Sequence, residues 1–530
     1  MGRPDLSLGL RAGTAKDVYG REPEGPTMSA TVHPAGSMRR PPASAPWLCA
    51  TLALSACQFA PPLRTPPVPT HARYTAVPVH STPGGLPPAR IPAQHFVYGP
   101  GLAHPWWHTF HSARLDALVA QALRHSPTVA AAEAELRIAR ANVQLSQAVF
   151  YPQVGLNLAA SRTKNSGANF GGHLPGSTFS LYTGNVAVSY YPDFFGINRL
   201  LYRGSAAQMH AQQAALSAAR LSLAGNVLDA AIGAAAAAAQ LRALNAAVSA
   251  ERQLLRLLEA QYRAGTVSYA SVLAQRAQLA ASQSQLPPLR QQLAAYHHLL
   301  AVLLGRAPSQ RRVRDFALND FTLPRTIPVA LPSALLRHRP DVRIAVEQMR
   351  YALTGIGIAK AQFYPLLTLT AAGGSSALTA DRLFDGASTV WSIGGALAQP
   401  LFEGGKLRAQ ERSAYAAYDV VRASYRSTVL GAFQQVADAL RALQNDGAAA
   451  REQEQLRQAL CAQVRLAEAG YRSGATDLSG VLLATIDCQS ARATLARLTA
   501  TRLQDTAALF VALGGDRWPT PGAARREPLR

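Results

Sequence analysis

A short stretch of this sequence occurs twice, and this repetition constrains the fold more than any other feature. Residues 262–275 read YRAGTVSYASVLAQ, and residues 471–484, which lie 209 positions later, read YRSGATDLSGVLLA. A segment that returns at a fixed spacing is typical of a chain built from copies of one structural unit. The sequence therefore predicts two copies of one plan, with one copy around each stretch.

Each copy contains two stretches in which apolar residues alternate with polar or small ones. The first stretch of each copy follows the tripeptide Phe-Tyr-Pro, at 150–152 and again at 363–365. Alternation with a period of two indicates strands that have one apolar face, so each copy should form a β-hairpin. The apolar positions are Val154, Leu156, Leu158 and Ala160; Val186, Val188 and Tyr190; Leu367, Leu369 and Ala371; and Trp391, Ile393, Gly395 and Leu397.

A long helical pattern follows each hairpin. Apolar residues recur at intervals of three and four from Val227 to Tyr262, and at intervals of seven from Val429 to Tyr471. Sustained heptads with small residues at the seam predict tightly packed helices that coil around each other. A helix over about 199–263 would be roughly 100 Å long at 1.5 Å per residue.

The repeated stretch marks the end of each long helix. It supplies a glycine, Gly265 or Gly474, and a new heptad pattern begins after it. Because glycine readily adopts the left-handed conformation that ends a helix, both stretches should be tips of antiparallel helical hairpins. The pair Pro287-Pro288 should kink the first return helix. Three charged residues interrupt the seams: Glu251, Arg457 and Arg502.

The N-terminal region reads as an export signal followed by a tether. Residues 38–57 contain two arginines, a short apolar run and small residues, which is the pattern of a secretory signal. Leu54-Ser55-Ala56-Cys57 resembles the lipobox of bacterial lipoproteins, in which the cysteine is acylated; an ordinary signal with a chance cysteine is the alternative. Residues 1–37 look structureless, so we expect the native start at Met28 or Met38. The Pro-rich range 58–104 reads as a tether.

The composition argues against several other classes of protein. The formal net charge is +22, but the arginines are scattered without interleaved aromatic residues, unlike a nucleic-acid-binding surface. The four cysteines form no Cys-x-x-Cys pair, so a zinc or redox motif is not expected. His297 and His298 are adjacent rather than four apart, and Gly404-Gly405-Lys406 is followed by Leu407. We therefore expect no metal site, phosphate loop, cofactor or catalytic constellation.

Four membrane strands are too few to form a closed barrel. The smallest membrane barrels have about eight strands, and lipid does not tolerate an open sheet edge. The chain must therefore oligomerise, with two copies giving eight strands and three giving twelve, or the strands lie outside a membrane. The residues alone do not choose between these arrangements.

Several short motifs in a fixed order resemble the TolC-like outer-membrane efflux proteins, in particular the lipoprotein branch that includes OprM and NodT. The motifs are Trp106-Trp107, Tyr191-Pro192-Asp193-Phe194-Phe195-Gly196, Leu303-Leu304-Gly305-Arg306, Arg339-Pro340-Asp341-Val342-Arg343 and the two Tyr-x-x-Gly tips. The resemblance implies a mostly α-helical homotrimer with a membrane β-barrel, in which twelve strands form the pore and twelve helices form a periplasmic tunnel. It also implies a periplasmic adaptor and an inner-membrane transporter of the resistance–nodulation–division type as partners, with the channel anchored to outer-membrane lipid.

The resemblance also divides the chain. Residues 1–57 would be the signal and lipobox, 58–104 the tether, 105–305 the first efflux repeat and 306–332 a linker. Residues 333–515 would be the second repeat and 516–530 a disordered tail.

The tip residues are candidates for a periplasmic gate. Tyr471 is similar to the family's gate tyrosine, Tyr262 holds the equivalent position, and Asp477 is a candidate partner for Arg472 or Arg263. The alternative is that the tyrosines only cap a hydrophobic seam and that Asp477 is a solvated charge.

The family often carries aspartates nine and twelve residues after the tip tyrosine. Here these positions hold Ser271, Ala274, Gly480 and Leu483. A less cation-selective entrance is therefore expected.

Two cysteines flank the second tip. Cys461 and Cys488 lie 13 residues either side of its middle, at similar heights in an antiparallel hairpin. In the oxidising periplasm a disulfide is one expectation, and two buried thiols are the other.

The sequence leads to one main functional reading, a lipid-anchored outer-membrane channel for the efflux of small molecules such as drugs and toxic organic compounds. A channel for type I protein secretion would use the same architecture. A periplasmic coiled-coil scaffold without a pore is a further alternative, and a hydrolytic enzyme is the most remote one.

Overall fold

The computed structural model describes residues 59–66, 73–84, 92–99, 105–166, 176–310 and 314–515. All of them belong to one compact unit that spans Cys57–Arg530. Cys57, the rest of the expected signal 1–57 and the expected tail 516–530 lie outside the described residues.

The two predicted copies are present and nearly equal in length. The first copy contains α2 (Ala113–His125), α3 (Pro127–Ala148), β2 (Gln153–Asn165), β3 (Ser177–Tyr190), α4 (Ile197–Arg263), α5 (Tyr269–Ser284) and α6 (Leu286–Leu303). The second contains α7 (Pro332–His338), α8 (Pro340–Ala361), β5 (Leu366–Ala377), β6 (Thr389–Ala398), α9 (Lys406–Arg472) and α10 (Leu478–Ala512). Because α4 and α9 both have 67 residues and α3 and α8 both have 22, the duplication predicted from the repeated stretch is confirmed.

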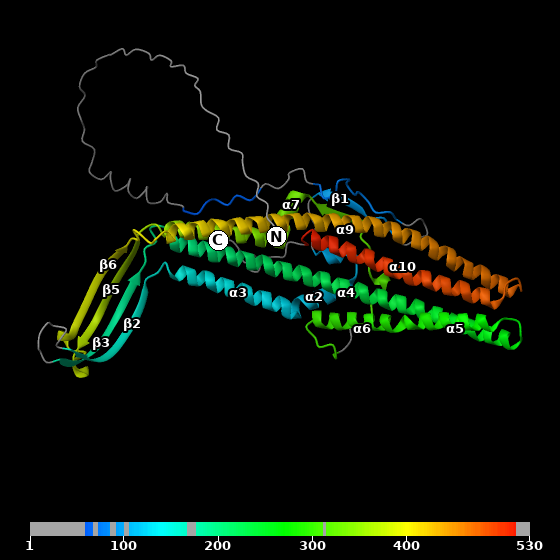
Figure 1. The fold of residues 1–530 in the computed structure, drawn as a ribbon, viewed down its shortest axis with the longest axis horizontal. Helices are drawn as coiled ribbons and strands as arrows, with labels where there is room; N and C mark the ends of the chain where they lie inside the picture. Colours follow the sequence, from blue (N-terminus) through cyan, green and yellow to red (C-terminus); the bar gives the residue numbers. More distant parts are fainter. Residues whose placement is uncertain are drawn as a thin grey trace, which may run out of the picture. The chain divides into compact units, whose positions relative to one another are not determined.

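The four predicted strands form one antiparallel sheet in the order β2-β3-β5-β6. The central pairing, between β3 and β5, joins the hairpin of the first copy to that of the second. The sheet lies at one end of the long helices and the two helical tips lie at the other (Figure 1). Each copy therefore contributes one half of the sheet and one tip.

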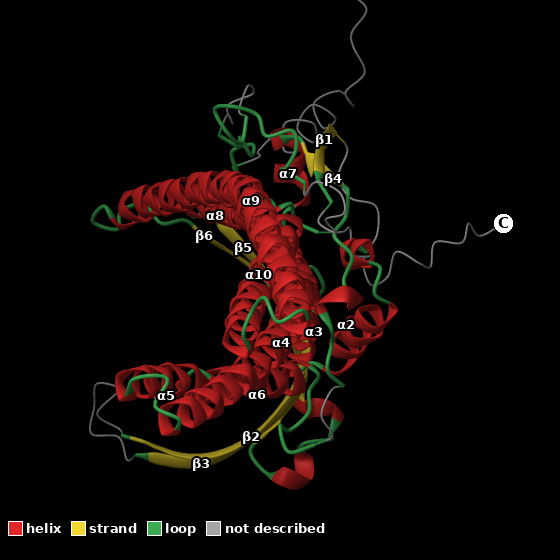
Figure 2. Cartoon of the chain, turned by 90° about the vertical axis from the view of Figure 1, so that its right-hand side faces the viewer, coloured by secondary structure: helices red, strands yellow, loops and turns green. Residues whose placement is uncertain are grey.

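The long helices lie side by side along a curved wall. Figure 2 looks along them and shows α9, α10, α4 and α5 following one another around a concave side. α4 contains a window that is long and apolar enough to cross a membrane, but 72% of that window is buried against the rest of the protein. The window therefore belongs to the helical core.

The two helical hairpins differ in their return helices. α10 is continuous over 35 residues, whereas the first return helix ends at Ser284 and restarts at Leu286. Proline at 287 and 288 lacks a backbone N–H and is tolerated only in the first turn of a helix. The predicted kink is therefore a break at Gln285, two residues before Pro287.

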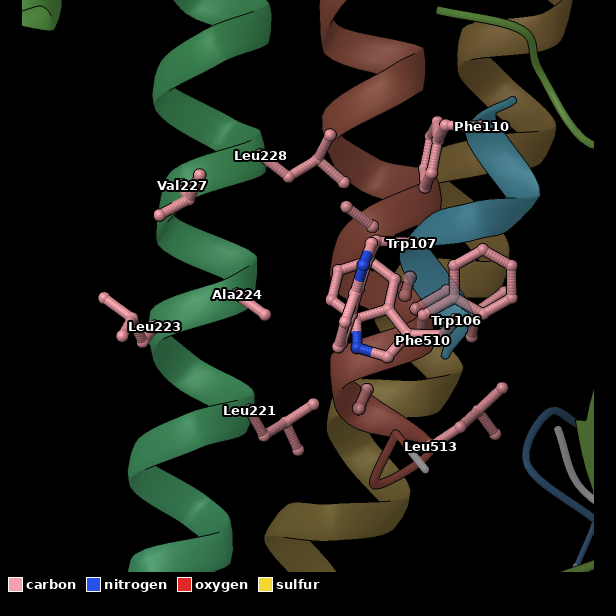
Figure 3. Close-up of a cluster of buried hydrophobic side chains, with 14 of the residues drawn as sticks. Trp106, Trp107, Phe110, Leu221, Leu223, Ala224, Val227, Leu228, Phe510 and Leu513 are labelled. Carbon is pink, nitrogen blue, oxygen red and sulfur yellow. The ribbon is translucent and has the colours of Figure 1, made fainter. Parts of the chain in front are cut away.

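A compact core surrounds the middle of the helices. Trp106, Trp107 and Phe110 of the short helix η1 (Trp106–Phe110) are buried against α4 and α10, and the Trp106 and Phe510 ring centroids are 5.7 Å apart (Figure 3). Gly233 of α4 passes directly beneath Tyr296 of α6, where an added methyl would lie 2.3 Å from the ring. This close packing fixes the helices that carry the tips.

Two short strands lie in ranges that the sequence reads as tether and linker. β1 (His95–Gly99) pairs in parallel with β4 (Thr326–Ala330), and Tyr74 donates a hydrogen bond to the Ala330 carbonyl at 2.7 Å. These parts of 58–104 and 306–332 are therefore packed structure. The sequence reading was misled by the prolines, which exclude helix but not a short edge strand.

Candidate functional site: the sheet wall and the hairpin tips

The sheet has one apolar face and one polar face, and the strand register explains why. Leu156 is opposite Val186, Val186 is opposite Gly373, and Gly373 is opposite Trp391, so every strand turns its apolar set the same way. On the other face the Asn157 side chain donates a hydrogen bond to that of Asn185 at 3.2 Å. The exposed apolar residues of the first face are Val154, Leu156, Leu158, Val186, Leu369, Trp391, Ile393 and Leu397. Such a surface suits lipid on one side and water on the other.

The outer edges of β2 and β6 have no strand partner among the described residues. Three antiparallel pairings separate these two strands, so they run in opposite directions. β6 of one copy can therefore pair with β2 of the next while the whole sheet stays antiparallel. A head-to-tail contact of this kind generates a ring when its rotation closes.

Large apolar residues mark both ends of the sheet. At the helix end Leu401 and Phe402 are 93% and 90% exposed, and Tyr151 is also exposed; at the far end Phe384 is 91% exposed. Single chains in water rarely leave so many large apolar groups uncovered. Girdles of aromatic residues at the two interfaces are typical of membrane barrels.

Both helical tips end in the same way. Gly265 and Gly474 have φ of +73° and +76°, in the left-handed region that the sequence predicts for them. Each glycine N–H donates to the carbonyl of the tip tyrosine, Tyr262 or Tyr471, at 2.9 and 3.2 Å. The next N–H donates to the residue before the tyrosine, at 2.9 and 2.8 Å. This paired pattern stops a helix sharply, and it places both tyrosines at the tip.

The two tip tyrosines are half-exposed and differ in their neighbours. The Tyr262 ring packs on that of Tyr269, with centroids 5.2 Å apart, whereas Leu478 holds the position equivalent to Tyr269 in the second tip. Within the described part of the chain neither the Tyr262 nor the Tyr471 hydroxyl has a hydrogen-bond partner. Both hydroxyls are therefore available to another subunit.

Asp477 is a helix cap in this chain and not the partner of an arginine. Its carboxylate accepts hydrogen bonds from the Ser479 hydroxyl at 2.6 Å and the Gly480 N–H at 3.0 Å, and these bonds hold the pKa of Asp477 below its usual value. Arg472 lies 3.9 Å from Glu468 instead. The expected pairing of Asp477 with Arg472 or Arg263 is not formed within the described chain, because the cap turns the carboxylate toward the first turn of α10.

The second hairpin is cross-linked near its tip. Cys461 of α9 and Cys488 of α10 form a disulfide, with Cα atoms 4.9 Å apart. The equivalent positions of the first hairpin hold Arg252 and Leu279. That hairpin instead buries Glu251, whose carboxylate accepts a 2.7 Å hydrogen bond from Ser282. The two hairpins thus differ, one with a covalent cross-link and one with a buried polar contact.

Arg502 holds the N-terminal segment against α10. Its side chain is fully buried and donates to the Thr82 hydroxyl and the Pro92 carbonyl, each at 2.8 Å, and to the Gln94 side chain at 3.1 Å. Gln94 also donates to Thr506 at 3.2 Å. The heptad interruption at Arg502 is therefore a clamp on a segment more than 400 residues away in the sequence.

A pair of carboxylates lies beside this clamp. Burial, followed by a hydrogen bond with Asp505 and the charge of Asp505, raises the pKa of Asp446 to about 7, although Arg502 opposes the shift. Burial in turn lowers the pKa of Arg502 to about 10. The sequence reasoning missed both carboxylates, because neither breaks a heptad and their contact joins α9 to α10.

The described residues contain no group of three or more His, Cys, Asp or Glu side chains arranged to hold a metal ion. His297, which the sequence reading treats as structural, lies 2.8 Å from Asp315 through its Nε2.

The two-faced sheet with open edges, joined to long helices that end in paired tips, defines an outer-membrane channel protein with a helical extension in the periplasm. The sequence profile of the family described as Outer membrane efflux protein matches residues 118–306 and 331–515. The chain belongs to this family, and the two matched ranges are the two structural copies.

Curated relatives carry related descriptions. The chain is 33% identical over 414 residues to the pyoverdine export outer membrane protein OpmQ of Pseudomonas putida, covering 77% of this chain and 87% of that protein. It is 26% identical over 470 residues to the toluene efflux pump outer membrane protein TtgF of Pseudomonas putida, covering 88% and 95%. Both matches extend over most of each relative.

Solved structures agree with the fold. The outer-membrane channel OprN superposes with a TM-score of 0.75 at 25% identity, covering 86% of this chain and 99% of that one. The outer membrane protein VceC of Vibrio cholerae superposes with a TM-score of 0.67 at 29% identity, covering 77% and 98%. The TolC-like fold and the efflux function expected from the sequence motifs are confirmed.

Proposed function

We propose that three copies of this chain form the outer-membrane channel of a tripartite efflux system. The sheet carries this proposal, because its two open edges run in opposite directions and can close only against other copies. Two copies would give eight strands, and side chains fill the interior of a barrel of that size. Three copies give twelve strands, the smallest ring of this chain that leaves a conduit.

A lipid anchor at Cys57 fits the start of the described chain. Phe59 lies two residues later, and its ring centroid is 4.8 Å from that of Tyr364, at the helix end of the sheet. Ala60 packs against α8. A methyl added to Gly357 of α8 would lie 3.2 Å from the Cα of Ala60. The start of the described chain at Phe59 therefore lies beside the strand exits, and a lipid anchor two residues earlier in the sequence would suit the periplasmic surface of the membrane.

The helical tips are the proposed gate. Tyr471 and Tyr262 would bond to neighbouring subunits in the closed state, since their hydroxyls lack partners within the described chain. Asp477 supports the gate by capping α10, and Arg472 lies near Glu468 at the same tip. Ser271 and Gly480 stand in the first turns of α5 and α10, and both leave the entrance without an acidic ring.

The proposed partners are a periplasmic adaptor and an inner-membrane transporter of the resistance–nodulation–division type, which would meet the tips. The cargo would be small organic molecules, as the pyoverdine and toluene in the relatives' descriptions suggest. No catalytic role is proposed for any residue.

Deletion of the gene, followed by susceptibility measurements across a panel of drugs and aromatic solvents, tests this function. Restored resistance on complementation with the wild-type chain, and its failure with a chain lacking β5 and β6, would support the channel. Unchanged susceptibility together with loss of a secreted protein would point to type I secretion instead.

A further inference from the structure

The apolar face of the sheet changes its chemistry at the far end of β2. Val154, Leu156, Leu158 and Ala160 alternate along this face, and Arg162 and Lys164 continue the same alternation. The register confirms their direction, because Ala160 is opposite Tyr182, Arg162 is opposite Ser180 and Lys164 is opposite Thr178. Two cations therefore stand on the lipid-facing side of the sheet, directly after its apolar band.

Four polar side chains gather at this corner: Arg162, Lys164, Thr178 and Ser180, here called the β2–β3 corner. Residues opposed across an antiparallel pair have Cβ atoms about 5 Å apart, and successive residues on one face of a strand are about 7 Å apart. Both cations are exposed. The corner thus presents a guanidinium, an ammonium and two hydroxyls within the reach of one or two phosphate groups.

The height of the corner matches the outer surface of the bilayer. From Val154 to Arg162 the strand rises about 27 Å, which projects to about 21 Å along the membrane normal at a tilt of about 40°. The same projection gives about 26 Å for Lys164, and the apolar band of membrane barrels is about 25 Å tall. Tyr182 stands between the apolar band and the cations, as interfacial aromatic residues do.

Nothing on these strands neutralises the two cations. β2 and β3 contain no Asp or Glu, and neither cation has an ion-pair partner among the described residues. In the sheet register β5 ends at Ala377, level with Ala160, and β6 begins at Thr389, level with Leu158, so neither strand reaches the height of the two cations. Among the four strands, the cations at this height are therefore those of the corner.

We propose that the β2–β3 corner binds the phosphate groups of lipid A, the phosphorylated glycolipid of the outer leaflet. Arg162 forms paired hydrogen bonds to one phosphate, Lys164 supplies a second positive charge, and the hydroxyls of Ser180 and Thr178 donate to the remaining oxygens. The glycolipid's acyl chains then lie along the apolar residues of β2. This contact would fix the height and tilt of the barrel in the outer leaflet.

Binding measurements with defined lipids test this proposal. The purified protein in detergent is titrated with diphosphorylated lipid A, with dephosphorylated lipid A and with phosphatidylglycerol, and bound lipid is counted by native mass spectrometry. Changing Arg162→Gln and Lys164→Gln together should weaken binding of diphosphorylated lipid A about tenfold or more, since each charged contact contributes substantially. Binding of the dephosphorylated form should not change.

The control variant changes Arg137→Gln and Arg140→Gln on α3, which removes the same charge outside the sheet and should leave binding intact. Unchanged affinity in the Arg162/Lys164 variant, or an equal loss for dephosphorylated lipid A, would overturn the proposal. So would phosphatidylglycerol binding as tightly and depending equally on the two cations, because the corner would then be a general anionic-lipid surface. Ion conductance of the same variant, which should be retained, separates this result from a failure of the channel itself.

Discussion

Replacing Arg502 with methionine should release the N-terminal segment from the helices. The methionine keeps an apolar side chain within the core but removes the three hydrogen bonds to Thr82, Pro92 and Gln94. These are the contacts that hold Thr82, Pro92 and Gln94 against α10. The change should therefore act on this segment first and leave the long helices folded.

The size of the effect follows from the surroundings of Arg502. Three hydrogen bonds from a charged donor would contribute about 5 to 9 kcal/mol if each were worth about 1.5 to 3 kcal/mol. Part of this is offset, because Nη1 of Arg502 has no hydrogen-bond partner in the described chain and burial lowers the pKa of the guanidinium to about 10. A net loss of about 3 kcal/mol is expected, which corresponds to about a hundredfold loss of protection in hydrogen exchange.

Hydrogen exchange with mass spectrometry measures this directly. The amides to follow are those of Thr82 and Phe96, which donate to Gln94 and His80 at 2.8 Å. Arg497→Met is the matched control, since Arg497 is exposed on the same helix, and it should change nothing. Unchanged protection in Arg502→Met, or an equal loss in both variants, would refute the clamp.

Three further predictions concern the helical hairpins. The folded-state pKa of Asp446, at about 7, lies above its ordinary 3.8, so between these two pH values the folded protein holds a proton that the unfolded chain releases. The unfolding temperature should therefore fall as the pH rises from about 4 to about 7, and Asp446→Asn should flatten this dependence in a thermal melt. Replacing Cys461 and Cys488 with serine should lower the unfolding free energy by about 3.5 kcal/mol, the chain entropy of a 27-residue loop, and a reductant should lower the melting temperature of the wild type but not of this variant. Asp477→Ala should cost about 1 kcal/mol at the start of α10, seen as faster exchange of its first-turn amides, whereas Asp477→Asn should retain the cap; equal exchange in both variants would contradict the capping role.

The sequence predicts the parts of this fold that depend on local patterns. The similarity of 262–275 to 471–484 was sufficient to predict the duplication. The alternation of apolar and polar residues around Leu156 and Ile393 was sufficient to predict the strands. Gly265 and Gly474 predicted both helix ends, because a left-handed turn leaves few choices of residue.

The remaining features depend on contacts between distant segments. β1 and β4 have no alternating pattern of their own and are defined by pairing over more than 200 residues. Arg502 was visible only as an interruption of a heptad, and its partners lie in a range that reads as a tether. Asp477 caps the start of α10 in this structure. From the sequence alone, an ion pair with an arginine and a capping hydrogen bond to Gly480 were both compatible with an aspartate at this position.

The number of chains that share one sheet is the central claim, and native mass spectrometry of the detergent-extracted protein measures it most directly. We expect a complex of three chains that persists in detergent and dissociates only when the strands unfold. A single chain that remains folded with all four strands, their two edges unpaired, would contradict it.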